Sequence, residues 1–108
     1  MFDSGLGGIQ TLRYLKDVLP QYSYCYLGDT AGLPYGTKDP QRIHDRTFAC
    51  CEWLFAQGCH LVILACNSAS TYAVRSRQQH YPERKVLSVT VPGIEVVVEK
   101  DLHHIGVL

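Results

Sequence analysis

The stretch that decides the fold reads HLVILACNSAS and spans residues 60–70. Its first half, from His60 to Ala65, is apolar on both faces, as the central strands of parallel sheets are. Cys66 stands at the carboxyl end of this predicted strand. The polar residues after it offer capping side chains for a helix that reaches about Gln79 and ends at Tyr81-Pro82. These capping residues are Asn67, Ser68 and Ser70.

Strand and helix signals alternate on both sides of this stretch, which predicts an α/β fold with an open parallel sheet flanked by helices. Further strands are expected at Met1-Phe2, Tyr22 to Leu27, Lys85 to Val89 and Ile105 to Leu108. One helix follows Gly5 to Gly8, presents Ile9, Leu12, Leu15 and Val18 on one face, and stops near Pro20.

A second helix is expected to begin at Asp39-Pro40, where aspartate is a good N-cap and proline fits the first turn. It runs to Gln57, and Gly58 provides the left-handed conformation that commonly follows a helix. Its apolar face consists of Ile43, Thr47, Cys50, Cys51, Leu54 and Phe55. The segment from Pro92-Gly93 is interpreted as a helix, although Val96 to Val98 favour a strand.

Length and charge limit the classes of protein that fit. The chain has 108 residues, enough for one domain, and ten basic residues balance ten acidic ones. Such a balance argues against nucleic acid or anionic membranes as partners. The longest apolar run, Leu61 to Cys66, is far too short to span a bilayer. We therefore expect a soluble cytoplasmic protein.

Cysteines and histidines show no metal or disulfide pattern. The five cysteines have neither CxxC spacing nor a regular framework, which disfavours disulfide stapling and structural zinc. Cys50 and Cys51 are interpreted as packing residues. His103 and His104 are neighbours and project in different directions, so no metal is expected.

Three polar segments follow the first three predicted strands: residues 3–8, 28–37 and 66–70. In an open parallel sheet, ligands bind outside the carboxyl ends of the strands, where helix N-termini also point. The second segment is longer than an ordinary strand-to-helix connection, which favours a binding role over a plain linker. These segments are the predicted site.

Cys66 is the first candidate for chemistry. A helix N-terminus carries positive partial charge that stabilises a thiolate, so Cys66 could act as a base or a nucleophile. The alternative is a small apolar side chain that fills the strand end. Its position between strand and helix favours the chemical role.

The first segment suits a small anion. Its glycines, Gly5 to Gly8, let backbone amides approach a carboxylate or phosphate, and Ser4 adds a hydroxyl. A dinucleotide fingerprint would need glycine at Gln10, although Asp29 lies near the ribose-binding distance. Asp3 would repel phosphate and fits a proton acceptor or an ammonium partner. The alternative for Asp3 is a helix cap or turn residue.

At these segments the sequence resembles glutamate racemase, in order and in spacing. The matching motifs are FDSGLGG at 2–8, GDTAGLPYGT at 28–37 and ACNSAS at 65–70. Three linked motifs are far more specific than any one. The resemblance covers essentially the whole chain, and IGVL at 105–108 is similar to the strand that opens the family's second domain.

The resemblance implies two similar α/β domains that face each other across a cleft, each with one catalytic cysteine. Residues 1–104 would be the first domain, with a truncated first strand, and residues 105–108 the start of a missing second domain. The family racemises glutamate without pyridoxal phosphate, so no cofactor is expected. Cys66 would donate and accept the proton, assisted by Asp3. The implied substrate-binding residues are Asp3, Ser4, Tyr35, Gly36, Asn67 and Ser68.

The sequence also departs from the family pattern. The family's second cysteine, in a Gly-Cys-Thr-His segment, has no counterpart here. Ser68 stands where threonine is usual, which keeps the hydroxyl. Residues 90–93 lack the glutamate usual before Pro92-Gly93, so the resemblance assigns this loop no role.

The sequence leads to three hypotheses for the function. The first is glutamate racemisation by the full-length parent, which would supply D-glutamate to peptidoglycan synthesis. In this hypothesis the chain is inactive alone, and a homodimer is possible. The second is a non-catalytic module that binds a small carboxylate or phosphate. The third is a thiol hydrolase with Cys66 as nucleophile, which ranks last because no histidine is placed by sequence to activate it.

Overall fold

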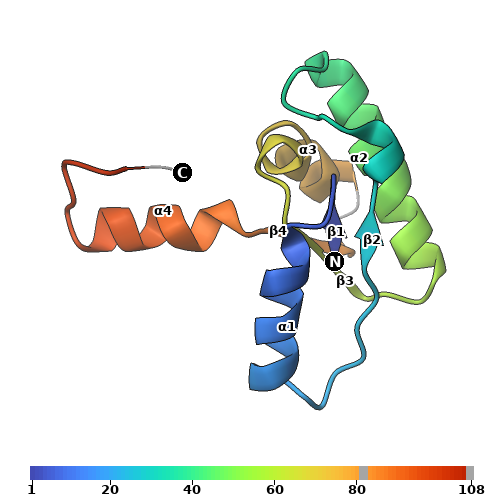
Figure 1. Cartoon of the computed structure of the whole chain (residues 1–108), viewed down its shortest axis with the longest axis horizontal. Coiled ribbons are helices and arrows are strands. Elements are labelled where there is room, and N and C mark those ends of the chain that lie inside the picture. The colour runs from blue at the N-terminus through green and yellow to red at the C-terminus, as the bar shows by residue number, and fades with distance from the viewer. Residues whose placement is uncertain (81–82, 107–108) are drawn as a thin grey trace.

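A computed structural model describes residues 1–80 and 83–106 of the chain. Strands and α-helices alternate along the chain (Figure 1), and a short 3₁₀ helix, η1, lies between β2 and α2. The strands are β1 (Phe2–Asp3), β2 (Leu27–Gly28), β3 (Leu61–Leu64) and β4 (Lys85–Ser88). The helices are α1 (Gly8–Val18), η1 (Thr30–Gly32), α2 (Pro40–Ala56), α3 (Asn67–His80) and α4 (Thr90–Glu99).

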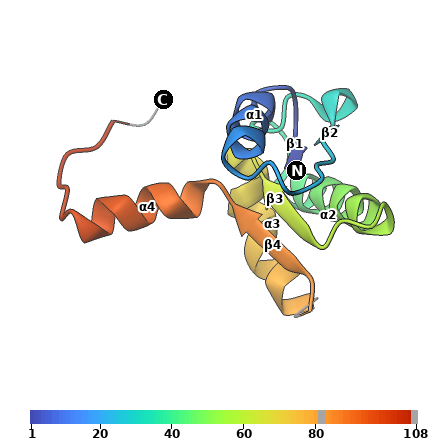
Figure 2. The ribbon, with the colours of Figure 1, turned by 90° about the horizontal axis from the view of Figure 1, so that it is seen from below.

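The strands form one parallel sheet in the order β2-β1-β3-β4. Helices α2 and α3 pack against each other and cover one face, while α1 lies on the other (Figure 2). The core lies between the sheet and the α2–α3 layer. Its buried side chains include Phe2, Val62, Leu64 and Val86 from the sheet, Ile43, Cys51 and Leu54 from α2, and Ala69 from α3. The predicted α/β fold is confirmed.

The two ends of α2 follow the sequence prediction. The Asp39 carboxylate accepts hydrogen bonds from the amides of Gln41 and Arg42 at 2.8 and 3.4 Å. At the other end Gly58 has φ +87°, a conformation that glycine adopts without steric cost. The Cys59 amide then donates to the Leu54 carbonyl, closing the helix with the bond typical of a Schellman motif.

The second strand is much shorter than expected. Residues Tyr22 to Leu27 were predicted as strand, but β2 includes only Leu27 and Gly28. These two residues pair with Phe2 and Asp3, the whole of β1. A strand needs a partner for its backbone groups, so the ladder is as short as β1 itself.

The predicted burial of β3 on both faces is wrong in part. Val62 and Leu64 are fully buried, whereas Leu61 is 41% exposed. Alternate residues of a strand face opposite sides of the sheet. Helices α2 and α3 contact β3 on one side, and α4, the helix after the neighbouring strand β4, extends away from the sheet (Figure 1). Leu61 therefore lacks the cover that a central strand ordinarily has.

After β4, the predicted helix forms, but the predicted strand does not appear in the described residues. Residues Thr90–Glu99 form a helix, as favoured, which starts two residues ahead of Pro92. No residue of α4 is buried. The predicted strand at 105–108 is absent at residues 105–106, and residues 107–108 lie outside the described residues, as does the predicted helix stop at Tyr81-Pro82.

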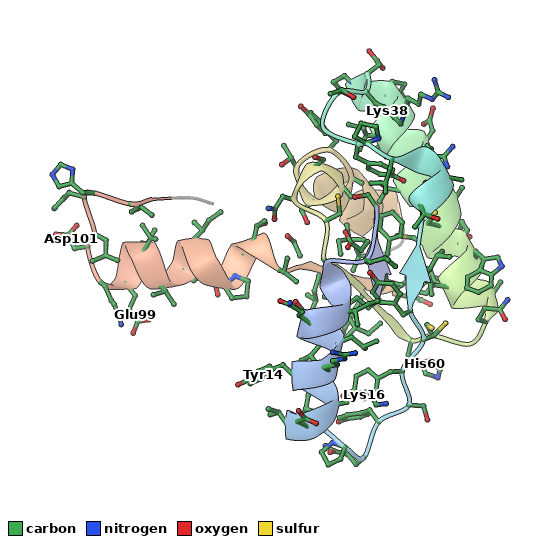
Figure 3. All side chains as sticks on the ribbon, in the orientation of Figure 1. Tyr14, Lys16, Lys38, His60, Glu99 and Asp101 are labelled. Carbon is green, nitrogen blue, oxygen red and sulfur yellow. The ribbon has the colours of Figure 1, made fainter. Side chains whose placement is uncertain are left out.

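Exposed side chains mark the limits of the packed layers. In Figure 3, Tyr14 extends outward from α1, and Glu99 lies near the free end of α4. Within the described residues, no helix combines the length and the hydrophobicity that crossing a membrane requires.

Candidate active site

The three predicted polar segments meet at the carboxyl edge of the sheet. Asp3 is in register with Gly28, and the Asp29 amide donates to the Asp3 carbonyl at 2.9 Å. On the other side of β1, the Ala65 amide donates to the Phe2 carbonyl at 2.8 Å. Parallel pairing thus carries the starts of all three segments to the same edge, as the order of elements predicts.

Cys66 lies where β3 passes into α3. Its thiol donates to the hydroxyl oxygen of Ser4, with Sγ and Oγ 3.2 Å apart, although these residues are 62 positions apart in the sequence. The Ala69 amide points at the same sulfur at 3.5 Å. The side chain is only 7% exposed. The thiol is therefore largely buried, but it contacts the aspartate-serine turn rather than the core alone.

The sulfur itself occupies the capping position of α3. Capping side chains were expected from Asn67, Ser68 and Ser70, but α3 already begins at Asn67 and Cys66 precedes it. The Ser70 hydroxyl instead donates to the Leu64 carbonyl at 3.4 Å. This correction places the Cys66 sulfur directly on the helix N-terminus, where backbone N–H groups favour negative charge.

Asp3 is both buried and engaged. Its Oδ2 atom accepts the Gly8 amide at 2.9 Å and the Tyr26 hydroxyl at 3.3 Å. The first bond caps the start of α1, which was the structural alternative considered for this residue. Burial, followed by the nearby Asp3 carboxylate, raises the pKa of Tyr26 to about 12, so the hydroxyl keeps one proton, which it shares between Asp3 and the Gly5 carbonyl 2.8 Å away. Both bonds end on one oxygen, and neither uses Oδ1.

Two glycines allow the close approach of these segments. A Cβ at Gly8 would lie 2.7 Å from the Ala65 Cβ, so only glycine lets α1 start against the end of β3. A Cβ at Gly28 would lie 2.5 Å from the Gly5 carbonyl oxygen. The glycines were expected to expose amides to an anion. Gly8 does not do so, because its amide is already bonded to Asp3.

The second segment is held by a partly buried ion pair. The Asp29 carboxylate binds Arg46 through two bonds of 2.7 Å, to Nε and to the terminal nitrogen. The Tyr35 hydroxyl donates to the same carboxylate at 2.7 Å. Hydrogen bonding to Arg46 lowers the pKa of Asp29, against the opposing effect of burial. The loop is thereby anchored to α2.

Arg46 was not identified from the sequence, because charged residues are expected along the solvent side of any amphipathic helix. The one signal in the sequence was the position of Arg46 directly before Thr47, which belongs to the buried face of α2. Since Asp29 is already bound by Arg46 and Tyr35, its carboxylate does not serve the ribose contact of a dinucleotide site.

The remaining predicted residues fall into two groups. A Cβ at Gly36 would lie 4.0 Å from the Ser68 hydroxyl, so the second and third segments approach each other, and Asn67 is exposed beside them. The Tyr35 side chain instead points into the core, 2% exposed, with its ring 6.2 Å from that of Phe2. The Tyr35 side chain therefore packs in the core and anchors the segment through Asp29.

Within residues 1–80 and 83–106, no group of three histidine, cysteine, aspartate or glutamate side chains is placed to hold a metal ion. The groups available for chemistry are a thiol, a hydroxyl, a carboxylate and backbone amides.

Comparison with known proteins gives one consistent relationship in sequence. No family model matches the chain. The glutamate racemase of Paracoccus denitrificans (strain Pd 1222) is 45% identical over 102 residues, which are 93% of this chain and 38% of that protein. The glutamate racemase of Ralstonia pickettii (strain 12J) is 45% identical over 95 residues, covering 88% of this chain and 32% of that protein. The chain thus spans well under half the length of these relatives.

Solved structures agree with the sequence relationship. Glutamate racemase from Aquifex pyrophilus superposes with a TM-score of 0.85 at 33% identity, covering 92% of this chain and 39% of that one. Glutamate racemase from Thermus thermophilus in complex with β-chloro-D-alanine superposes with a TM-score of 0.76 at 34% identity, covering 82% and 34%. Identity and fold together therefore show that this chain is a homologue of the glutamate racemases, matching a part of their length.

Proposed function

We propose that the chain provides the Cys66 half of a glutamate racemase. In this proposal residues 1–104 form the first of two α/β domains and residues 105–108 begin the second. The observation that carries it is the Cys66 sulfur on the N-terminus of α3, 3.2 Å from Ser4, where all three motif segments meet. The relatives named above support the substrate, since they are glutamate racemases.

The chemistry needs a base and an acid on opposite faces of the α-carbon. A thiolate at Cys66 removes the α-proton from one enantiomer, and a thiol there returns a proton when the reaction runs in reverse. The second thiol would come from the opposing domain. No pyridoxal cofactor is needed in this scheme, because the amides at helix N-termini offset the negative charge that develops on deprotonation.

Substrate recognition is proposed for the residues around the sulfur. The amides of Asn67 and Ser68 at the start of α3 can donate hydrogen bonds to a carboxylate, and the side chains of Ser4, Asn67 and Ser68 lie around that turn. Asp3 assists Cys66 or pairs with the substrate ammonium, and the main chain at Tyr35-Gly36 closes the site. The Thermus relative binds β-chloro-D-alanine, a small amino acid, which is the same class of ligand.

The proposal extends to a cellular role. D-glutamate is a component of peptidoglycan, so the parent enzyme would supply cell-wall synthesis in the cytoplasm and could act as a homodimer. The chain alone is expected to be inactive, because one thiol cannot serve both faces of the substrate.

A chimera tests the catalytic claim. The matched 102 residues of the Paracoccus racemase would be replaced by the corresponding residues of this chain. Circular dichroism of L- and D-glutamate follows racemisation, and proton NMR in deuterium oxide follows loss of the α-hydrogen. We expect activity that falls by roughly 10²–10⁴-fold in Cys66→Ser. Cys59→Ser, before the amino end of β3 and so at the opposite edge of the sheet from Cys66, is the matched control.

Two results would count against the racemase. A folded chimera that exchanges the α-hydrogen equally well after Cys66→Ser would exclude the proposed base. Tight binding of phosphate or a nucleotide by the chain, unchanged by Cys66→Ser and with no binding of glutamate, would favour the non-catalytic module.

A further inference from the structure

Tyr26 directly precedes β2 and contacts the first polar segment. Its hydroxyl lies 2.8 Å from the Gly5 carbonyl oxygen and 3.3 Å from Oδ2 of Asp3. A tyrosine hydroxyl has one proton to donate, so these two acceptors share it. Tyr26 lies outside the three motifs that indicated the site in the sequence. Its contacts nevertheless connect the approach to β2 with the turn that follows β1.

The ring of Tyr26 is confined at both edges. A Cβ at Gly8 would lie 3.4 Å from the ring atom Cε2, and a Cβ at Gly28 would lie 3.3 Å from Cε1. The ring therefore occupies space that a side chain at either glycine would need, between the start of α1 and the end of β2. Packing of the ring fixes the position of the hydroxyl, in addition to its hydrogen bonds.

The turn that Tyr26 contacts presents two residues of the candidate site. Ser4 lies between Asp3 and Gly5, the two residues that the Tyr26 hydroxyl contacts. The hydroxyl oxygen of Ser4 accepts the Cys66 thiol at 3.2 Å. One phenol group thus holds the chain on both sides of the residue that meets the sulfur. Its contact with Asp3 is made to Oδ2, so Tyr26 does not use the second carboxylate oxygen.

We propose that Tyr26 is a positioning residue for the Cys66 half of the racemase, and that its hydroxyl holds the turn formed by residues 3–5. With the turn held, Ser4 stays within hydrogen-bonding distance of the sulfur and the Asp3 carboxylate keeps one orientation. This inference rests on the proposed function and deepens it. Burial, followed by the Asp3 carboxylate, raises the pKa of Tyr26 to about 12, so the phenol stays protonated and acts only through its neighbours.

Tyr24 provides a matched control. Its hydroxyl contacts the carbonyl oxygens of Leu15 and Leu19 at 3.1 and 2.8 Å, at the end of α1 that lies away from the site. Tyr24→Phe and Tyr26→Phe each remove a hydroxyl that lies 2.8 Å from a backbone carbonyl. Both changes keep the ring and its packing. Only Tyr26→Phe removes a contact with a residue of the site.

Alkylation of the chain itself tests the local contact. Iodoacetamide is added at about pH 8.5, near the ordinary thiol pKa, and peptide mass spectrometry follows modification of Cys66 with time. Loss of the Tyr26 hydroxyl frees the turn, so the sulfur is bonded to Ser4 for less of the time. We expect Cys66 to react roughly 2- to 10-fold faster in Tyr26→Phe and at an unchanged rate in Tyr24→Phe. Equal rates in the two variants would overturn the inference.

Kinetics of the chimera described above test the effect on proton transfer. Tyr26→Phe should lower kcat by about tenfold, with a smaller change in KM, because the loss lies in the reacting geometry. Slower transfer at Cys66 should also raise the isotope effect of α-deuterated glutamate in the direction in which Cys66 removes the proton, and lower it in the other. A merely structural loss would alter both directions alike. The melting temperatures of the two phenylalanine variants should agree.

The results separate this inference from the proposed function. If Cys66→Ser abolishes exchange of the α-hydrogen and Tyr26→Phe changes the two isotope effects in opposite senses, both are supported. If Cys66→Ser abolishes exchange but Tyr26→Phe behaves like Tyr24→Phe, the racemase proposal stands and the role of Tyr26 is wrong. If exchange does not depend on Cys66, the proposed function is wrong and the role of Tyr26 fails with it.

Discussion

Helices α2 and α4 differ in a way that their compositions do not predict. Helix α4 reads TVPGIEVVVE and is the more apolar, yet none of its residues is buried. Helix α2 has several charged residues, and four of its positions are buried, among them Ile43 and Leu54. Its apolar positions recur every three or four residues and face α3 and β3, whereas α4 extends away from the sheet (Figure 1). Burial therefore depends on an opposing surface, not on apolar content alone.

The largest expected effect comes from removing a buried side chain of α2. Leu54 is fully buried in the layer between α2 and the sheet. Leu54→Ala should lower the free energy of unfolding by about 2–5 kcal/mol, through lost apolar burial and the cavity left behind. Urea denaturation followed by circular dichroism measures the change. A loss below about 1 kcal/mol would mean that α2 is not the main packed helix.

A smaller effect is expected at the ion pair that joins α2 to the loop after β2. Asp29→Asn removes the charge that Arg46 binds while keeping the size of the side chain, and should cost about 1–3 kcal/mol near neutral pH. The pKa of Asp29 is lower in the folded chain than in the unfolded one, so its contribution is present above the unfolded value of about 3.9 and is lost as pH falls through the folded value.

Denaturation at several pH values measures this contribution. The difference in unfolding free energy between the native chain and Asp29→Asn should shrink as the solution is acidified below about pH 4. A difference that stays constant across that range would mean that the carboxylate and Arg46 are not paired in solution. Among its described residues, helix α4 has no comparable, partly buried ion pair, so acidification should not change its contribution in this way.

The smallest effect is expected in α4. Val98 is 73% exposed, and Val98→Ala removes apolar surface that is already in water. The change in unfolding free energy should stay within about 0.5 kcal/mol. Urea denaturation followed by circular dichroism measures this change, as it does for Leu54→Ala. A loss of more than about 1 kcal/mol would show that α4 packs against a surface in solution, and would remove the contrast with α2.

Local chemistry predicted much of the fold. Asp39 followed by proline specified the start of α2, and Gly58 specified its end. These signals depend on backbone hydrogen bonds within a few residues, so they can be identified without a structure. The length of β2 could not be predicted in this way, because a strand extends only as far as its partner, and β1 is distant in sequence.

Some features of the candidate site could also be predicted from the sequence, and others could not. Its place at the carboxyl edge of the sheet, and Cys66 as its thiol, followed from the order of strands and helices. The bond from Cys66 to Ser4 and the anchoring of Asp29 by Arg46 did not. Capping of α3 by sulfur instead of by the polar residues after it also became visible only in three dimensions.

The amino-acid sequence by itself determined the order of elements, the ends of α2 and the sharing of one sheet edge by the three polar segments, because these follow from local backbone chemistry and the parallel order of strands. Tertiary structure alone decided which side chains are buried and which polar atoms pair, including Cys66 with Ser4. Such pairings join residues far apart in the chain, and packing brings them together with no local signal.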